Sequence, residues 1–273
     1  MKARQLLPLL MPVILCLSAG CTQKTQPEEK PLLLIQENAA TFSDGTSADL
    51  WKEENGTHDF YLLPDGTTLL DIQEPAGPDN FFVAGLEGLD DLNKNAQTSV
   101  LDYFEKQGLL YNTQAELELA YAEYLESMKN GAGYTGRYIS QDIAPTASNA
   151  HIICFATAVL LPDSGQSMKE IRLGTVFDRN TGNALDNWDL FNLPEEEVGH
   201  WLLEKSGIND SALMAEMESA LRPEYLLLFP DYLEINFPQG TLPSQEYSYC
   251  ISLEYDSDIR SVLHPWAIPI SGS

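Results

Sequence analysis

Strand-like and helix-like stretches are segregated along this chain of 273 residues, and that order constrains the fold more than any other feature. Short β-rich stretches come first and two helical patterns follow. A run of strand patterns then precedes two more helical patterns and the last strands. Regular alternation would favour a parallel sheet, whereas separate blocks favour an α+β fold. We therefore expect α+β architecture with mainly antiparallel sheets, about four helices packed on them, and two subdomains.

One hairpin is predicted by its turn chemistry. Pro64-Asp65-Gly66 separates two strand patterns at 59–63 and 67–72. Proline presets φ for a turn and glycine permits a positive φ, so the two strands should pair. Further strand patterns cover residues 32–35, 138–143, 151–161, 171–178, 225–229, 232–237 and 247–255.

Helical spacing of apolar residues predicts helices at 89–104 and 113–129. Thr113 and Glu116 have the spacing of a capping box, which indicates the start of the second helix. The apolar stripe that we expect this helix to bury against a sheet consists of Leu117, Tyr121, Tyr124, Leu125 and Met128. Pro194 and the three glutamates after it indicate a third helix, and residues 209–221 form a fourth pattern that Pro223 ends.

The first residues have the order of a secretory signal. Lys2 and Arg4 precede an apolar run at 6–17, and Ser18-Ala19-Gly20 then leads to Cys21. A small-residue site that ends on a cysteine resembles the lipobox of bacterial lipoproteins, in which the thiol receives a diacylglycerol. The alternatives are an ordinary signal peptide or a transmembrane anchor, but the run is shorter than the ~20 residues of a spanning helix. We expect lipidation at Cys21 and a membrane-anchored location in the cell envelope, on the extracytoplasmic side.

These patterns divide the chain into four parts. Residues 1–20 are the expected signal peptide and residues 21–45 the expected tether, because 22–31 are polar, contain two prolines and show no periodicity. Residues 46–165 are the expected N-terminal α+β subdomain, and 166–273 the C-terminal one.

Charge narrows the choice of partner. The chain has 41 acidic and 15 basic residues, a formal net charge of -26. Such a body is repelled by nucleic acid, which excludes nucleic acid as a partner, and it attracts cationic proteins. The alternative is that the acidity serves solubility only.

Two cysteines remain beyond the lipidation site, Cys154 and Cys250. Outside the cytoplasm they are able to form a disulfide, but free cysteines are commonly small buried hydrophobic residues. Their spacing does not decide between the two, and we favour two buried thiols.

No catalytic, metal or cofactor motif emerges. Residues 41–45 (TFSDG) look like the metal motif of polysaccharide deacetylases, whose ligands include two histidines four residues apart. The histidines here, His58, His151, His200 and His264, are never that close, so we interpret the match as chance. His151 lies in an apolar stretch, which favours a core histidine.

A second candidate metal site is a group of acidic residues near the C-terminus. Glu254, Asp256 and Asp258 have ligand types suited to calcium, but a solvated turn is the favoured interpretation. We therefore expect no metal and no cofactor.

Residues 176–183 (VFDRNTGN) and 188–191 (WDLF) resemble a family of extracytoplasmic domains with a strand ending FD…TG, a turn, DLF and a helix. This RsiV-like family includes the ectodomain of the lysozyme-sensing anti-sigma factor RsiV and a domain of unknown function that accompanies some peptidoglycan deacetylases. The resemblance covers roughly residues 50–270. Within the motif, Asp178, Asn180 and Gly182 have the chemistry of a turn, and Leu190 and Phe191 that of a buried helix approach.

Two departures limit what the resemblance implies. Residues 161–166 (LPDSGQ) replace a Gly-Ala-His segment that many members have, and the chain shows neither a sigma-binding region nor a membrane span. The resemblance implies a non-enzymatic, surface-exposed lipoprotein that binds or senses something in the envelope, such as a cationic protein like lysozyme. Its partner-binding residues and oligomeric state are not set by the sequence.

Two other classes of function stay open. The first is a cell-envelope hydrolase or deacetylase with an unrecognised site, which would bring His151, His200 or His264 together with carboxylates in a cleft. The second is a purely structural component, which would present an exposed apolar patch instead.

Overall fold

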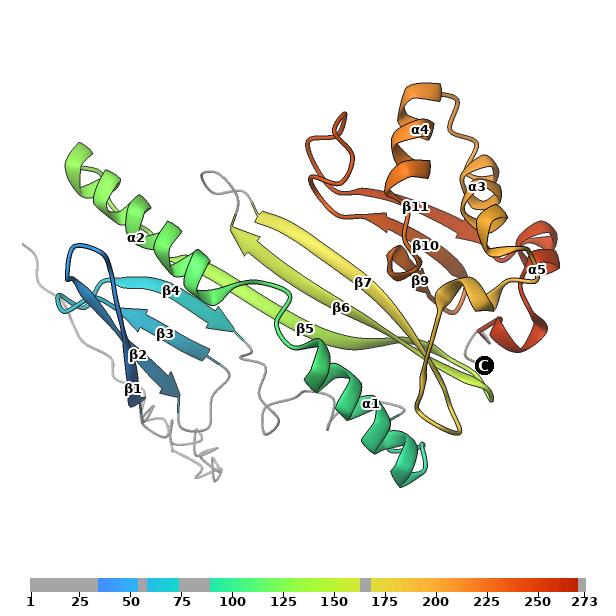
Figure 1. Cartoon of the computed structure of the whole chain (residues 1–273), viewed down its shortest axis with the longest axis horizontal. Helices are drawn as coiled ribbons and strands as arrows, with labels where there is room; N and C mark the ends of the chain where they lie inside the picture. Colours follow the sequence, from blue (N-terminus) through green and yellow to red (C-terminus); the bar gives the residue numbers. More distant parts are fainter. Residues whose placement is uncertain (1–33, 54–57, 74–88, 163–167, 270–273) are drawn as a thin grey trace, which may run out of the picture. The chain divides into compact units, whose positions relative to one another are not determined.

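The computed structural model describes residues 34–53, 58–73, 89–162 and 168–269. The described residues belong to one compact unit. Two sheets and five α-helices make up the described part (Figure 1). Mainly antiparallel pairing confirms the predicted α+β class, since β4 and β5 are the one parallel pair among the described strands.

The larger sheet has eight strands in sequence order. They are β1 (Leu34–Thr41), β2 (Ser47–Glu53), β3 (His58–Leu62), β4 (Thr68–Gln73), β5 (Arg137–Ser148), β6 (Ile152–Pro162), β7 (Met168–Asp178) and β8 (Ala184–Leu185). The smaller sheet has the order β11-β10-β9, from β9 (Leu226–Leu228), β10 (Tyr232–Phe237) and β11 (Tyr249–Glu254).

The α-helices are α1 (Lys94–Gln107), α2 (Thr113–Asn130), α3 (Glu195–Lys205), α4 (Ser211–Ala220) and α5 (Ser257–Val262). Three short 3-10 helices are η2 (Asn187–Leu190), η3 (Pro223–Tyr225) and η4 (Pro265–Ala267). Within the described residues, none of these helices combines the length and the apolar sequence needed to cross a lipid bilayer.

The two faces of β6 pack against different elements. Ile153 and Phe155 join the cluster of buried residues around α1, whereas Ile152 and Cys154 join the cluster beneath the smaller sheet. Alternate strand residues point to opposite faces, so the period of two sends these neighbours to the two layers. Near the N-terminal end of β6, the larger sheet is therefore covered by α1 on one face and by the smaller sheet on the other.

Close backbone contact joins the two sheets at Gly174 of β7. A Cβ atom there would lie 1.9 Å from the carbonyl oxygen of Leu226, so no larger side chain fits. The buried side-chain amide of Asn187 donates to the carbonyl oxygens of Gly174, Pro223 and Leu226 at 3.3, 2.8 and 3.2 Å. One amide thus ties η2, η3 and both sheets together.

Helix α2 lies along β4 (Figure 1) and buries only part of its predicted stripe. Leu117 and Tyr121 are buried as expected, but Leu125 and Met128 are 46% and 60% exposed. The prediction was wrong for these two because both lie in the last turns of the helix, beyond the buried positions. Arg137 of β5 fixes the helix on the sheet through ion pairs of 2.7 Å to Glu116 and 2.6 Å to Glu123.

The start of α2 also differs from the prediction by one residue. Asn112, and not Thr113, is the N-cap, and its side chain accepts from the amide of Ala115. Glu116 turns to Arg137 instead of closing a capping box. An asparagine caps as well as a threonine, so the neighbouring residue competes successfully for the position.

The hairpin predicted at Pro64-Asp65-Gly66 is confirmed by the pairing of β3 with β4. A second turn of the same kind, at residues 42–46, joins β1 to β2. In both turns, the backbone amide of the first residue donates to the carbonyl oxygen of the last, from Phe42 to Thr46 and from Leu63 to Thr67. The amide of the last residue donates in turn to the side chain of an aspartate within the turn. Tyr121 and Tyr124 of α2 donate to these two aspartates, Asp44 and Asp65, at 2.7 and 3.3 Å. The two hairpins are thus held by one helix.

The boundaries of the parts need one correction. Residues 34–45, expected in the tether, form β1 and the first turn. The polar sequence of β1 has little strand signal of its own, and the segment forms a strand because it pairs with β2. The boundary expected between 165 and 166 lies outside the described residues, and β6 and β7 on either side of it pair with each other.

Candidate functional site

The lipidation site Cys21 and the signal peptide lie outside the described residues. The lipid anchor therefore stays a prediction from the sequence.

The FD…TG segment is scaffold, as predicted. One Asp178 carboxylate oxygen accepts from the amides of Asn180 and Thr181 and from the Thr181 hydroxyl. These bonds lower the pKa of Asp178 against the opposing effect of its partial burial. Gly182 has a φ of 70° and packs on the start of α1, where a Cβ would lie 2.2 Å from the carbonyl oxygen of Ala96. Leu190 and Phe191 are buried.

The cysteines behave differently from each other. Cys154 is buried and free, as expected, whereas Cys250 is free but exposed. The prediction of two buried thiols was wrong for Cys250, because it lies on the edge strand β11 at a position that faces away from the core. Partial removal of the thiol from water, together with the negative charge of Glu234, raises the pKa of Cys250 to about 11, so this exposed thiol is not a thiolate nucleophile at neutral pH.

Among the four histidines, His151 contradicts its prediction. It is an exposed turn residue just before β6 and not a core histidine. The ring of His264 stacks on Trp266, and His58 contacts Asp71 at 2.8 Å. His200 has the most charged surroundings, on the exposed side of α3.

His200 joins α3 to α4 through carboxylates. Its Nδ1 lies 2.7 Å from Glu218 of α4, and its Nε2 lies 3.3 Å from Glu204 of α3. The hydrogen bond to Glu218, with the charge of Glu204, raises the pKa of His200 above its ordinary value. Gly199 lies beside the Leu221 side chain, and a Cβ there would lie 3.1 Å from the Leu221 Cδ2 atom.

A cleft of about 470 Å³ opens beside this contact. It is lined by Trp188, Glu195, Glu196, Gly199, His200, Glu218 and Leu221. Glu195 and Glu196 are exposed in the first turn of α3, where the positive end of the helix dipole favours acids, and they form no ion pair within the described residues. The acidic cleft is therefore built from the glutamates predicted to start α3 and a glutamate of α4. Spacing alone gives no signal for that pairing.

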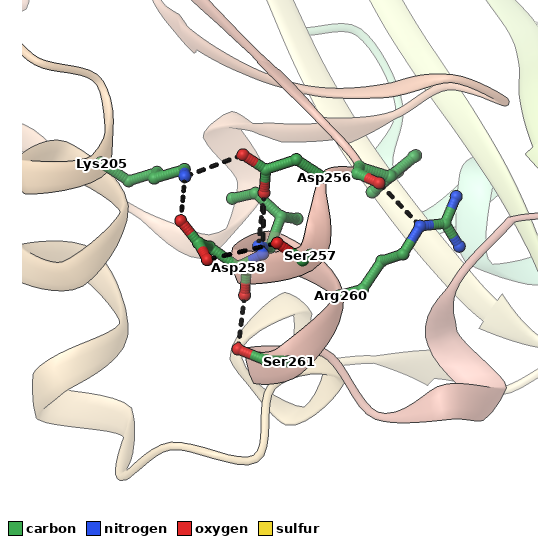
Figure 2. Close-up of polar contacts among 8 residues, drawn as sticks. Lys205, Asp256, Ser257, Asp258, Arg260 and Ser261 are labelled. Atoms are coloured by element: carbon green, nitrogen blue, oxygen red, sulfur yellow. Dashed lines mark hydrogen bonds and ion pairs between the residues drawn. The ribbon is translucent and has the colours of Figure 1, made fainter.

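The acids at the end of β11 form a capped helix start (Figure 2). Asp256 caps α5 by accepting from the amides of Asp258 and Ile259. The Lys205 ammonium lies between Asp256 and Asp258, at 2.8 and 2.6 Å. These carboxylates already have a cation of the chain, which agrees with the interpretation as a turn.

Across the described residues, no group of three or more histidine, cysteine, aspartate or glutamate side chains is placed to hold a metal ion. The TFSDG segment, which looks like a deacetylase metal motif, is the hairpin turn between β1 and β2. Its resemblance to a metal site is a coincidence of turn chemistry.

No family model matches the sequence, and no curated protein is similar to it. Solved structures that resemble the chain weakly include two proteins of the DUF3298 family. A DUF3298-family protein from Pseudomonas aeruginosa PAO1 is 13% identical with a TM-score of 0.36, over 88% of this chain and 98% of that one. A DUF3298-family member from Bacteroides fragilis is 14% identical with a TM-score of 0.39, over 85% of this chain and 92% of that one. Members of a family defined as a domain of unknown function are thus among the structural neighbours of this chain.

Proposed function

We propose that the chain is a non-enzymatic binding or sensing module of the cell envelope, anchored by lipid on Cys21, whose partner is a cationic protein such as lysozyme. The observation that supports this most is the acidic cleft between α3 and α4. It belongs to a chain with a net charge of -26, which steers cationic partners towards it over a long range.

The cleft has the chemistry of a site for an arginine or lysine side chain. Glu195 and Glu196 offer carboxylates that form no ion pair with any described residue, and Trp188 adds an aromatic ring to the lining of the cleft. A cation held between carboxylates and an aromatic ring gains both charge pairing and cation–π attraction. His200 and Glu218, already paired with each other, line the same cleft.

One observation favours an envelope hydrolase or deacetylase instead. His200 does converge with carboxylates in a cleft, which is the arrangement that such an enzyme needs. However, carboxylates lie beside both ring nitrogens and raise the pKa of His200, which favours the protonated ring, and a protonated imidazole has no lone pair with which to act as a general base. Release of acetate or sugar from cell-wall polymer, lost in His200→Gln, would establish the enzyme and contradict the proposal.

The binding proposal is tested by measuring association of lysozyme with the full chain at rising salt. We expect retention at low salt and an association rate that falls steeply with salt, because exposed charges are screened. Glu195→Gln with Glu196→Gln should weaken binding several-fold. Asp102→Asn with Glu105→Gln is the matched control, since it removes two exposed charges from α1, away from the cleft.

Three results would contradict this proposal. The first is no retention of lysozyme or of any other cationic envelope protein at low salt. The second is complete loss of binding by moderate salt, which indicates non-specific attraction. The third is an equal loss in the cleft and control variants, because binding would then follow total charge and not the cleft.

A further inference from the structure

The larger sheet has an aromatic strip on the face opposite α2. Trp51 of β2 pairs with Phe60 of β3, Phe60 with Asp71 of β4, and Asp71 with Tyr138 of β5. Residues directly opposite on paired strands point to the same face, so these four form a row across four strands. His58 and Gln73 are paired in the next row on that face. We call Trp51, His58, Phe60, Asp71, Gln73 and Tyr138 the open-face strip.

The intervening residues show which face this is. Ile72 and Ile139 alternate with the strip along β4 and β5, and both lie in the buried cluster that contains Leu117 of α2. The strip is therefore turned away from the helix. Trp51, Phe60 and Tyr138 are half-buried and belong to none of the three buried clusters that the described residues form.

Contacts among the strip residues fix the orientation of their side chains. The ring of His58 stacks on Phe60 with centroids 5.6 Å apart and an angle of 8° between the planes. His58 Nδ1 lies 2.8 Å from an Asp71 carboxylate oxygen, and the Tyr138 hydroxyl donates to the Gln73 side-chain oxygen. The aromatic rings are thus set in place before any ligand arrives.

Hydrogen-bonding capacity is left over beside these rings. His58 Nε2, the second Asp71 oxygen and the Gln73 amide nitrogen make no hydrogen bond within the described part of the chain. The side chains of His58 and Asp71 are each 28% exposed, so these groups are accessible from solvent. Aromatic surface with a few oriented polar groups is the usual lining of a small-molecule site.

Charge distinguishes the strip from the acidic cleft. Asp71 is the single acid among the six strip residues, and its carboxylate is hydrogen-bonded to His58; Asp49, which shares the face of Trp51, lies one row away, opposite Leu62. The strip is thus suited to an uncharged ligand. A sugar ring has an apolar C–H face that stacks on an aromatic ring and hydroxyls at its edge that bond to carboxylate, imidazole and amide groups. Four strands at ~4.8 Å spacing span about 14 Å, which suits several rings and not one.

We propose that the open-face strip binds a neutral glycan chain, whose rings stack on Trp51, Phe60 and Tyr138 and whose hydroxyls bond to Asp71, His58 and Gln73. This site is independent of the acidic cleft and of the cationic partner.

Calorimetric titration of the full chain with β-1,4-linked tetramers of N-acetylglucosamine and of glucose tests the proposal. We expect binding of at least one tetramer, little changed by salt because the ligand is uncharged. Trp51→Ala and Phe60→Ala should each weaken binding by about tenfold, the usual cost of losing a central aromatic contact. Trp266→Ala is the matched control, because Trp266 stacks on His264 at 5.6 Å and 11°, outside the strip.

Asp71→Asn keeps the test decisive if an aromatic variant fails to fold, because it preserves side-chain volume. A folded Asp71→Asn variant should bind several-fold more weakly, with an unchanged thermal midpoint. The proposal is overturned if neither tetramer binds the unaltered chain, or if all strip variants bind as the control does. A concentration-dependent dimer that Trp51→Ala dissociates would also overturn it, because a second copy would then cover the strip.

Discussion

Leu117 and Leu125 show how burial divides one apolar stripe. They lie eight positions apart on α2, yet Leu117 is 1% exposed and Leu125 is 46% exposed. Leu117→Ala should lower the free energy of unfolding by about 2–5 kcal/mol through lost burial and a cavity. Leu125→Ala should change it by less than about 0.5 kcal/mol, as for a surface position. Urea unfolding of both variants checks this, and equal losses would show that the end of α2 is buried.

Arg137 is a single residue with a large structural role. Its side chain is 7% exposed, and it contacts two glutamates of α2 as well as the carbonyl oxygen of Pro162. The period-two pattern of β5 places this charge on an inward face, where sequence reasoning expects an apolar residue. Glu116 and Glu123 of α2 compensate the buried charge of Arg137, and only the tertiary structure brings these residues together.

At the scale of elements, the two hairpin turns are equivalent. Gly45 and Gly66 both have a φ of 86°, and a Cβ at either would meet open space. Any cost of a side chain there is therefore backbone strain alone, which is about 1–2 kcal/mol for an L-residue with positive φ.

Gly45→Ala and Gly66→Ala should accordingly lower the free energy of unfolding by that amount each, measured in urea. Gly133→Ala is the control, because Gly133 has open space around it and no positive φ. It should be neutral or slightly stabilising. A similar loss at Gly133 would mean that glycine flexibility, and not the turn conformation, sets the effect.

The elements that the sequence predicted best are those with local signals. The hairpin at Pro64-Asp65-Gly66 and the four longer helices each have a turn, cap or periodicity within a few residues. Strands β1 and β2 were assigned poorly or missed, since their order comes from pairing with neighbours. The turn at residues 42–46 was not predicted for a different reason, because its sequence resembles a metal-binding motif.

At the scale of the whole molecule, the predicted lipid anchor on Cys21 is a proposal that one substitution tests. Cys21→Ala should abolish labelling by a fatty-acid analogue and release the protein from membranes, because the acyl chain is the expected attachment. Fractionation of cells that express each form measures this. A variant that stays on the membrane would contradict the lipoprotein prediction.

The candidate sites depend on tertiary structure to different degrees. The glutamates of the acidic cleft stand out in the sequence as a helix start after Pro194, but their companion Glu218 is 18 residues from His200. The open-face strip has no sequence signal, because its row takes one residue from each of four strands. Only the register of the sheet selects those residues.

By itself, the sequence determined the α+β class, the first hairpin, the main helices, the turn chemistry of the FD…TG segment and the charge. All of these depend on short-range propensity or on composition, and neither requires a tertiary contact. The tertiary structure alone decided that Leu125 and His151 are exposed, that Arg137 is buried, and that His200 meets Glu218. Burial and side-chain pairing depend on what packs opposite a residue, and that neighbour is set by strand register and helix placement far along the chain.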